Sequence, residues 1–588
     1  MESVRRRLVR DPSTSFGFDL LITALVSTGF MLVAVAPVLD RLKVAWGAGD
    51  LISHYVNVDL WRGFGYQAST HYGFPGGMDQ NLFPGLDITQ NSIAALLSRI
   101  FGDPFIGLNL LALLSFPLTA VLAVVAFRLV GMTGWWAIAL SLSYTFLPYH
   151  WGRLLGHTYL GTMYAAVTGV ILALIIGQGR LSAGKTTHKV WLITGVLVII
   201  TAWSNVYYAA FGLLLMASAL LFRILQGDGW RSLLRSTIPF LATFTGILIG
   251  FIPSLIARAS EPGVVQLGSR FAYDSVSLAG NLSMLLLPAP VSQLPYMGYY
   301  NAAARGLIEE APALENVSET NFGTWIILFG LLFLLVWWIM RKRSGRHTPP
   351  DLQLLVLLIV VMLLFFIPWG LNALFAEFIS AQIRAWNRLV PTLAMLILLS
   401  VAVAVRRSPL MRPPWRWLIP ALVALVVLVE QVIPYRAVYV RTIDVYEENT
   451  MWAKEYAQNV NAMLPESCAV AQFPYMAYPE NGTIKPELID YEHFWHSLLN
   501  GERDFSYGAV RMSESGALLA DIDLPLSARD VQQLRELGFC GVHVDLRGIK
   551  KVDRVRALAE LEQQLGAPIT SGREGDWLLY SIPQLQRD

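Results

Sequence analysis

Acidic side chains gather in one polar stretch of this chain, residues 37–104, which follows the first long apolar segment. All of them are aspartates, namely Asp40, Asp50, Asp59, Asp79, Asp87 and Asp103. Most of the chain before residue 435 is apolar, so these carboxylates stand beside a set of membrane helices. A carboxylate in such a place is a candidate general base, because partial loss of water raises its pKa.

Asp50 is the strongest candidate, because an amphipathic pattern follows it. The apolar positions of this pattern are Leu51, Ile52, Tyr55, Val58 and Leu60. They predict a helix that lies along the membrane surface and holds a carboxylate at the mouth of a cavity. Asp50 and His54, four residues apart, then share one face of the helix. We predict that Asp50 is the base and that His54, its neighbour, helps to bind the substrate phosphate; a solvated loop aspartate or a helix cap is the plainer alternative for Asp50.

Asp79 and Asp87 are secondary candidates in segment 72–87, which is rich in glycine, proline and aromatic residues. The glycines and prolines predict tight turns, and the aromatic rings favour a position at the level of the lipid headgroups. The segment either closes over a site or caps the helix bundle.

Two pairs of basic residues repeat the same spacing. Arg384 and Arg388 lie four residues apart at the end of an apolar span, and Arg153 and His157 have the same separation in a short loop. Arginine at a helix end commonly reaches toward lipid headgroups. Two cations on one face also make a good clamp for a phosphate group. We therefore predict that these four residues bind a phosphate-linked substrate.

The composition identifies a membrane protein that crosses the bilayer many times. Hydrophobic residues make up 55% and charged residues 15% of the 588-residue chain, and the mean hydropathy is +0.50. Soluble globular proteins rarely reach such values. No basic run interleaved with aromatic residues suggests nucleic-acid binding, and we recognise neither a glycine-rich phosphate loop nor a zinc-ligand spacing.

Eleven apolar segments are long enough to suggest membrane spans. They are residues 18–37, 105–127, 134–148, 160–178, 190–204, 206–222, 238–257, 324–340, 352–371, 390–405 and 417–434. With the N-terminus in the cytoplasm, every cytoplasmic connection carries lysine or arginine, as the positive-inside rule expects. The junction at Ser204 and Asn205 is either a tight outer turn or a break within one helix.

This topology divides the chain into two domains. Residues 1–435 form the transmembrane domain, and residues 436–588 form a second domain outside the cytoplasm. The loops on the outer face are residues 37–104, 149–159, 258–323 and 372–389. Loops longer than about 12–15 residues are often functional. The expected location is the plasma membrane, with the N-terminus cytoplasmic and the C-terminal domain extracytoplasmic.

The C-terminal domain has the pattern of a small α/β fold. Helices are predicted over 447–463, 528–537 and 552–565, and strands over 468–473, 539–545 and 577–581. The alternation suggests a small, mostly parallel sheet. Cys468 and Cys540 begin two of these strands and are either buried thiols or a disulfide. Neighbouring parallel strands outside the cytoplasm favour the disulfide.

The chain resembles the GT-C superfamily of integral-membrane glycosyltransferases, which use polyprenyl-phosphate sugars. The matching features are a first span followed by a long outer loop with Gly49-Asp50 through His54-Tyr55, about eleven spans, a terminal outer domain, and the segment from Ile383 to Arg388. Residues 500–508 also resemble bacterial, in particular actinobacterial, members. The resemblance implies that Asp50 is the base or organises the acceptor. Leu51 stands where some members carry a second acidic residue, which leaves a requirement for Mg²⁺ or Mn²⁺ open.

The resulting expectation is a transfer of one sugar, inverting or retaining, from a polyprenyl-phosphate donor to a glycan or lipid of the cell envelope. The donor would lie between loop 258–323 and the helix bundle, and the C-terminal domain would bind the acceptor. The rival interpretations are a lipid flippase or transporter and a non-catalytic assembly protein of the envelope. Transporters usually carry ionisable groups near the middle of the membrane, and the predicted spans contain almost none.

Overall fold

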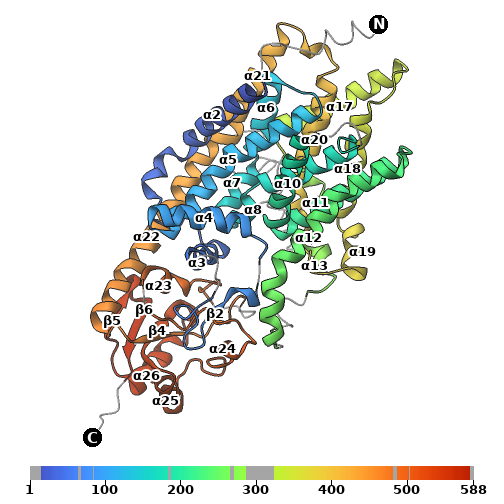
Figure 1. The fold of residues 1–588 in the computed structure, drawn as a ribbon. Coiled ribbons are helices and arrows are strands. Elements are labelled where there is room, and N and C mark those ends of the chain that lie inside the picture. The colour runs from blue at the N-terminus through green and yellow to red at the C-terminus, as the bar shows by residue number, and fades with distance from the viewer. Residues whose placement is uncertain are drawn as a thin grey trace.

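The computed structural model describes residues 15–63, 68–83, 85–182, 187–261, 263–264, 270–286, 323–480, 486–501 and 503–582. The chain is mostly helical, with a large bundle at one end and a small α/β region at the other (Figure 1). Short helices and loops of the first 100 residues lie between the two parts (Figure 1).

Each predicted apolar span is a helix. These helices are α2 (Phe16–Val35), α5 (Pro104–Leu129), α6 (Gly134–Thr145), α9 (Tyr164–Gly177), α10 (His188–Trp203), α11 (Val206–Leu225), α12 (Trp230–Ser260), α17 (Trp325–Arg343), α18 (Pro350–Phe366), α20 (Val390–Val405) and α21 (Trp415–Val426). Helices α10 and α11 are separate and both pack against α9 and α12, so their junction is a turn.

The number of full-length spans is smaller than the number of apolar helices. Among the described residues, seven helices are long and apolar enough to cross a membrane. Helix α18 and α19 (Leu371–Phe378), bent by 65° at their junction, provide an eighth. Helices α6, α9 and α10 have only 12, 14 and 16 residues, fewer than the roughly 20 that a straight span requires. The chain is a multi-pass membrane protein.

The polar stretch after α2 is largely helical. It contains η1 (Ala36–Arg41), α3 (Asp50–Arg62), η2 (Gln80–Leu82), α4 (Ile88–Phe101) and a two-stranded ribbon of β1 (Ala68–Ser69) and β2 (Met78–Asp79). The predicted amphipathic helix is α3, which begins at Asp50. Its apolar face packs on protein, because Leu51, Ile52 and Tyr55 are at most 1% exposed. The Tyr55 hydroxyl donates to Asn109 on α5 and fixes α3 against the bundle.

The segment predicted as the outer loop 149–159 is also helical. It consists of α7 (Pro148–Leu154) and α8 (Thr158–Gly161), and Tyr149, His150 and Trp151 are buried. The loop prediction is wrong here because these aromatic residues pack inside the bundle rather than connecting two spans across its surface. Trp151 stacks on Tyr435, with ring centroids 5.4 Å apart.

One long helix connects the bundle to the α/β region. Helix α21 continues through a π-helical segment, Val427–Val432, into α22 (Ile433–Met463). Figure 1 shows α22 running from the bundle to the sheet of the C-terminal region. The predicted helix 447–463 is the second half of α22, and the predicted boundary at residue 435 falls inside this helix.

The C-terminal sheet has four strands in the order β3-β4-β6-β5. They are β3 (Ala469–Phe473), β4 (Phe539–Asp545), β5 (Thr570–Gly572) and β6 (Trp577–Ser581), with helices α23 (Phe494–Leu499), α24 (Glu514–Ala517), α25 (Ala528–Glu536) and α26 (Arg554–Leu565). The prediction of a mostly parallel sheet is wrong, because only β3 and β4 run parallel. The short connection between β5 and β6 imposes antiparallel pairing.

The predicted disulfide is present. Cys468 directly precedes β3 and Cys540 lies in β4, and their Cα atoms are 5.5 Å apart. The parallel pairing of these two strands brings the cysteines together, as the sequence pattern predicted. The bond closes a loop with a sequence separation of 72 residues.

Candidate active site

A cavity of about 580 Å³ lies where the bundle, the polar stretch and the C-terminal region meet. Its walls come from α3, residues 80–83 and 85–87, the start of α8, the α10–α11 turn, the end of α12, residues 382–388, residues 478–480 and Tyr491. Most of the predicted site residues line it, namely Asp50, His54, Asp87, His157, Arg384 and Arg388. Residues far apart in the sequence thus form one polar site.

Asp50 pairs with His157 rather than with its helical neighbour His54. The Nδ1 atom of His157 lies 2.6 Å from Oδ2 of Asp50. Burial by itself raises the pKa of Asp50, but the hydrogen bond and charge of His157, with the charges of His54 and Arg388, lower it below its ordinary value. The carboxylate is 41% exposed and opens into the cavity. Asp50 is therefore an ionised carboxylate held in place by an imidazole.

His54 follows Asp50 by one helical turn, as predicted, but it packs against an aromatic ring. Its imidazole stacks on Tyr159, with ring centroids 4.0 Å apart. Burial lowers the pKa of His54 to about 3, against the opposing charge of Asp50. A neutral imidazole at the wall of the cavity can accept or donate a hydrogen bond to a sugar hydroxyl without adding charge.

Asp87 is a second carboxylate of the cavity and is bound by the turn between α10 and α11. Asn205 has a φ of +90°, which places its backbone N–H 2.8 Å from the Leu86 carbonyl and its Nδ2 3.0 Å from Oδ1 of Asp87. Burial raises the pKa of Asp87 to about 6, although Asn205 and Arg388 act in the opposite direction. Asp50 and Asp87, which line the same cavity, thus differ in proton affinity.

Four arginines line the cavity, and sequence reasoning found two of them. Besides Arg384 and Arg388, the structure adds Arg258 at the end of α12 and Arg270. Within the described part of the chain, neither Arg258 nor Arg388 has a carboxylate within ion-pair distance. Arg258 ends a predicted span on the outer face, so the argument that singled out Arg384 could have found it too.

Arg388 interacts electrostatically with two carboxylates of the cavity. Its guanidinium lies over the ring of Tyr207, 4.2 Å from the centroid, and its charge favours the ionised forms of both Asp50 and Asp87. The prediction that Arg384 and Arg388 share one helical face is wrong. Arg384 lies in an irregular segment before the short 3-10 helix η5 (Trp386–Leu389), which contains Arg388. The tertiary fold still brings both to the same cavity.

Glu480 of the C-terminal region reaches the same arginines. Its two carboxylate oxygens lie 2.9 and 3.1 Å from the guanidinium nitrogens of Arg270, and one lies 3.8 Å from Arg384. Burial raises its pKa, but Arg270, Arg384 and Arg511 together lower it below the ordinary value. Tyr478 of the same segment donates to Gln80. The C-terminal region therefore closes one wall of the cavity.

Two predicted residues lie outside the cavity lining. The side chain of Arg153 is buried in the bundle over the ring of Tyr149, and its carbonyl accepts from the backbone N–H of His157. Asp79 caps η2, because its Oδ1 accepts from the backbone N–H of Asn81 at 2.8 Å. Segment 72–87, to which Asp79 belongs, also pairs with the C-terminal region through the backbone of Phe74.

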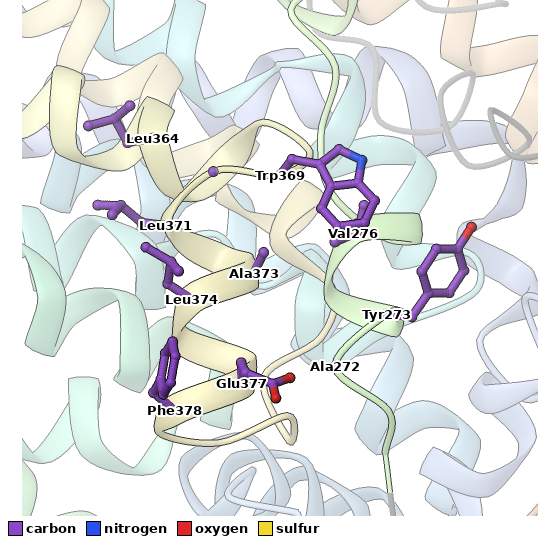
Figure 2. Close-up of a pocket in the computed structure, with 11 residues that line it drawn as sticks. Ala272, Tyr273, Val276, Leu364, Trp369, Leu371, Ala373, Leu374, Glu377 and Phe378 are labelled. Atoms are coloured by element: carbon purple, nitrogen blue, oxygen red, sulfur yellow. The ribbon is translucent and has the colours of Figure 1, made fainter.

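An apolar groove of about 670 Å³ lies between α18, α19 and the short helix α13 (Asp274–Ser277). Figure 2 shows Leu371, Leu374 and Phe378 along α19, Trp369 on the loop before this helix, and Tyr273 and Val276 at α13. Asp274 of α13 lies 3.8 Å from Arg384, so the groove adjoins the charged cavity. Most of the predicted donor-binding loop 258–323 lies outside the described residues.

No protein-family model and no curated protein matches this chain, but solved structures do. The arabinofuranosyltransferase AftD from Mycobacteria aligns with a TM-score of 0.53 at 14% identity, over 97% of this chain and 40% of AftD. This chain therefore spans less than half the length of AftD. ArnT from Cupriavidus metallidurans, solved bound to undecaprenyl phosphate, aligns with a TM-score of 0.50 at 11% identity, over 97% of this chain and 99% of ArnT. Both are GT-C glycosyltransferases, and this chain has the GT-C fold.

Proposed function

We propose that this chain is a membrane glycosyltransferase that moves one sugar from a polyprenyl-phosphate donor to a glycan or lipid acceptor during cell-envelope and cell-wall biogenesis. The observation that carries the proposal is the joint location of the Asp50–His157 pair and four arginines in one cavity. The fold supports it, because ArnT, whose structure includes undecaprenyl phosphate, aligns along nearly its whole length. The reaction would take place on the extracytoplasmic face.

Asp50 would be the base of an inverting transfer. It accepts the proton of the acceptor hydroxyl while that oxygen attacks the anomeric carbon. The bond between this carbon and the phosphate oxygen breaks, and the leaving phosphate keeps the electron pair. His157 holds the carboxylate ionised and oriented, and passes the accepted proton toward solvent. A retaining transfer would use the same donor and the same cavity.

The arginines would bind the donor phosphate. Arg258 and Arg388, which have no carboxylate partner among the described residues, offer positive charge to an incoming anion. Arg384 and Arg270 share Glu480 and so give the phosphate a second place to bind when this carboxylate moves aside. Stabilising the charge that develops on a leaving phosphate is a large contribution to catalysis.

The polyprenyl chain would lie in the apolar groove between α13 and α19. The groove adjoins the cavity at Arg384, so a lipid bound there places its phosphate among the arginines. Exposed Trp369, Leu374 and Phe378 line it, which suits an isoprenoid chain better than water. The sequence-based expectation of a donor between loop 258–323 and the bundle names the same region.

No step of this proposal passes through a divalent cation. Mg²⁺ and Mn²⁺ bind clusters of oxygen ligands. The nearest partner of Asp50 is the imidazole of His157, and the charge of Arg388 acts on both Asp50 and Asp87. These surroundings do not fit such a cation. Neutralising the leaving phosphate is therefore assigned to the arginines.

The decisive experiment compares Asp50→Asn with Asp79→Asn in a transfer assay. The full chain is reconstituted in liposomes with a panel of polyprenyl-phosphate pentoses and hexoses and with envelope glycan acceptors. We expect Asp50→Asn to lose transfer by at least about 100-fold, because general-base catalysis typically contributes 10²–10⁴-fold. Asp79→Asn keeps the cap of η2 and retains transfer.

Donor binding and protein level serve as controls for the loss. Binding of undecaprenyl phosphate persists in Asp50→Asn, because the arginines are unchanged. Undiminished transfer by Asp50→Asn overturns the role of Asp50. Movement of the lipid across the bilayer without a new glycosidic bond shows a flippase, and neither transfer nor lipid movement shows an assembly protein.

A further inference from the structure

Three buried histidines meet in the core of the C-terminal region, and none of them lines the cavity. They are His493, His496 on α23 and His543 on β4, which are 1%, 2% and 0% exposed. One ring nitrogen from each lies within 4.8 Å of those of the other two. Within the described residues this is the one such group of histidine, cysteine or acidic side chains. Two distant segments thus bring three imidazoles together.

The local structure brings the three imidazole rings close together. His493 precedes α23 and His496 lies three residues later, so one helical turn presents both on the same side. The ring centroid of His543 lies 4.0 Å from that of His496 and 6.0 Å from that of His493. No zinc-ligand spacing is recognisable in the sequence, because the third histidine, His543, lies on a strand far along the chain from the other two.

Some ring nitrogens of this cluster are held by neighbouring oxygens and others are not. His493 Nε2 lies 3.1 Å from the carbonyl of Pro474, and His543 Nδ1 lies 2.7 Å from the hydroxyl of Tyr456. In the part of the chain that the structure describes, Nδ1 of His496 and Nε2 of His543 have no hydrogen-bond partner. Metal-binding histidines usually donate their second ring N–H to a carbonyl or a similar oxygen, as this arrangement allows.

Leaving these nitrogens without a partner is unfavourable. A buried polar atom without a hydrogen bond has lost its bonds to water and has gained none in return. A cation among the three rings would give Nδ1 of His496 and Nε2 of His543 a partner at once. The surrounding charges are balanced, because Asp545 and Glu492 lie next to Arg547, and Arg573 lies over Trp577. The imidazole donors themselves must therefore supply the affinity for a cation.

We propose that His493, His496 and His543 form a zinc site that ties the segment containing α23 to strand β4. Imidazole nitrogen suits zinc and related transition metals, and three histidines leave one position of a tetrahedron for a non-protein ligand. Because the site is closed to solvent, its role is structural. It is independent of the sugar transfer proposed above.

The test is the metal content and metal response of the full chain, purified with a tag that contains no histidine. We expect about one zinc per chain by mass spectrometry, as a single site requires. We also expect the visible absorption bands of a tetrahedral ion after replacement with Co²⁺. His496→Gln and His543→Gln lose the metal and the bands. His347→Gln, an exposed histidine between α17 and α18, keeps both.

Two further measurements keep the proposal testable if these variants fold poorly. Tyr456→Phe removes the hydroxyl that holds His543 and lowers zinc affinity by about 10–100-fold. A chelator lowers the melting temperature of the unaltered chain, and added Zn²⁺ restores it. A chain that binds neither Zn²⁺ nor Co²⁺ and whose melting temperature ignores the chelator overturns the proposal, and binding of Cu²⁺ or Ni²⁺ alone overturns the assignment to zinc.

Discussion

The Asp50–His157 pair determines how the proposed site responds to pH. Two effects oppose each other at Asp50, because burial disfavours the charged carboxylate while the hydrogen bond and charge of His157 favour it. The second group of effects is larger, so the pKa of Asp50 falls below its ordinary value. The pairing therefore stabilises the fold above the unfolded pKa of the carboxylate, and this stability is lost as the pH falls through the folded pKa.

His157→Gln tests this balance. The substitution removes the charge and the principal hydrogen bond that lower the pKa of Asp50, while burial still raises it. A base is active only when it is deprotonated, so we expect the acidic limb of the pH–rate profile to move to higher pH in this variant. The measurement is the rate of sugar transfer between about pH 4 and 8, a range that spans ordinary carboxyl and histidine pKa values.

His347→Gln is the matched control and leaves the acidic limb in place, because this side chain is exposed and distant in the fold. If the profile has an acidic limb near pH 6 and Asp87→Asn removes it, that limb reports the titration of Asp87. Burial raises the pKa of Asp87 to about 6. An unchanged limb in His157→Gln, with normal protein level, would contradict the coupling between His157 and Asp50.

At the scale of elements, close helix packing places the side chains of the cavity wall. Helices α9 and α11 approach each other at two glycines, where a Cβ added to Gly169 would lie 3.0 Å from the Cα atom of Gly212. Small residues allow this approach in membrane helices. Helix α11 begins just after Asn205 and carries Tyr207, the residues that hold Asp87 and Arg388. Packing deep in the bundle therefore sets the geometry of the site.

Gly169→Ile should push α11 away from α9. Overpacking of this kind costs about 1–3 kcal/mol, so we expect a lower melting temperature in detergent and a higher KM for the donor. Gly195→Ile on α10 is the control, because a Cβ added there meets nothing within 4 Å. Equal melting temperatures for the two variants would show that the α9–α11 contact tolerates bulk.

At the scale of the whole molecule, the C-terminal region completes the site that the membrane bundle begins. Helix α22 extends out of the bundle, and Glu480 and Tyr491 of the C-terminal region line the cavity. This arrangement requires the C-terminal region to lie on the same face of the membrane as α3. The positive-inside pattern predicts that this face is extracytoplasmic.

Labelling of introduced cysteines tests the orientation. Both native cysteines are joined in a disulfide, so an engineered thiol is the target of a maleimide reagent that does not cross membranes. We expect Lys551→Cys, at a position whose side chain is 76% exposed, to react in intact cells. Arg346→Cys, between α17 and α18, should react only after permeabilisation. The reverse pattern would place the C-terminal region in the cytoplasm.

The sequence by itself determined the apolar helices, the start of α3 at Asp50, the second half of α22, helices α25 and α26, three of the four strands of the C-terminal region, and the disulfide, but not the short helices α23 and α24. Each of these depends on residues close together in the chain, or on two strands whose pairing follows from their order. The parallel sheet and the loop at 149–159 were wrong, because strand pairing and aromatic burial depend on the surrounding fold.

Only the tertiary structure decided which groups meet. It paired Asp50 with His157 instead of His54, removed the side chain of Arg153 from the cavity lining, and added Arg258 and Arg270. It also brought together the three histidines of the C-terminal core. The physical reason is that a periodic pattern fixes which side chains share a face. The neighbours of that face come from helices and strands far along the chain, and only their packing selects them.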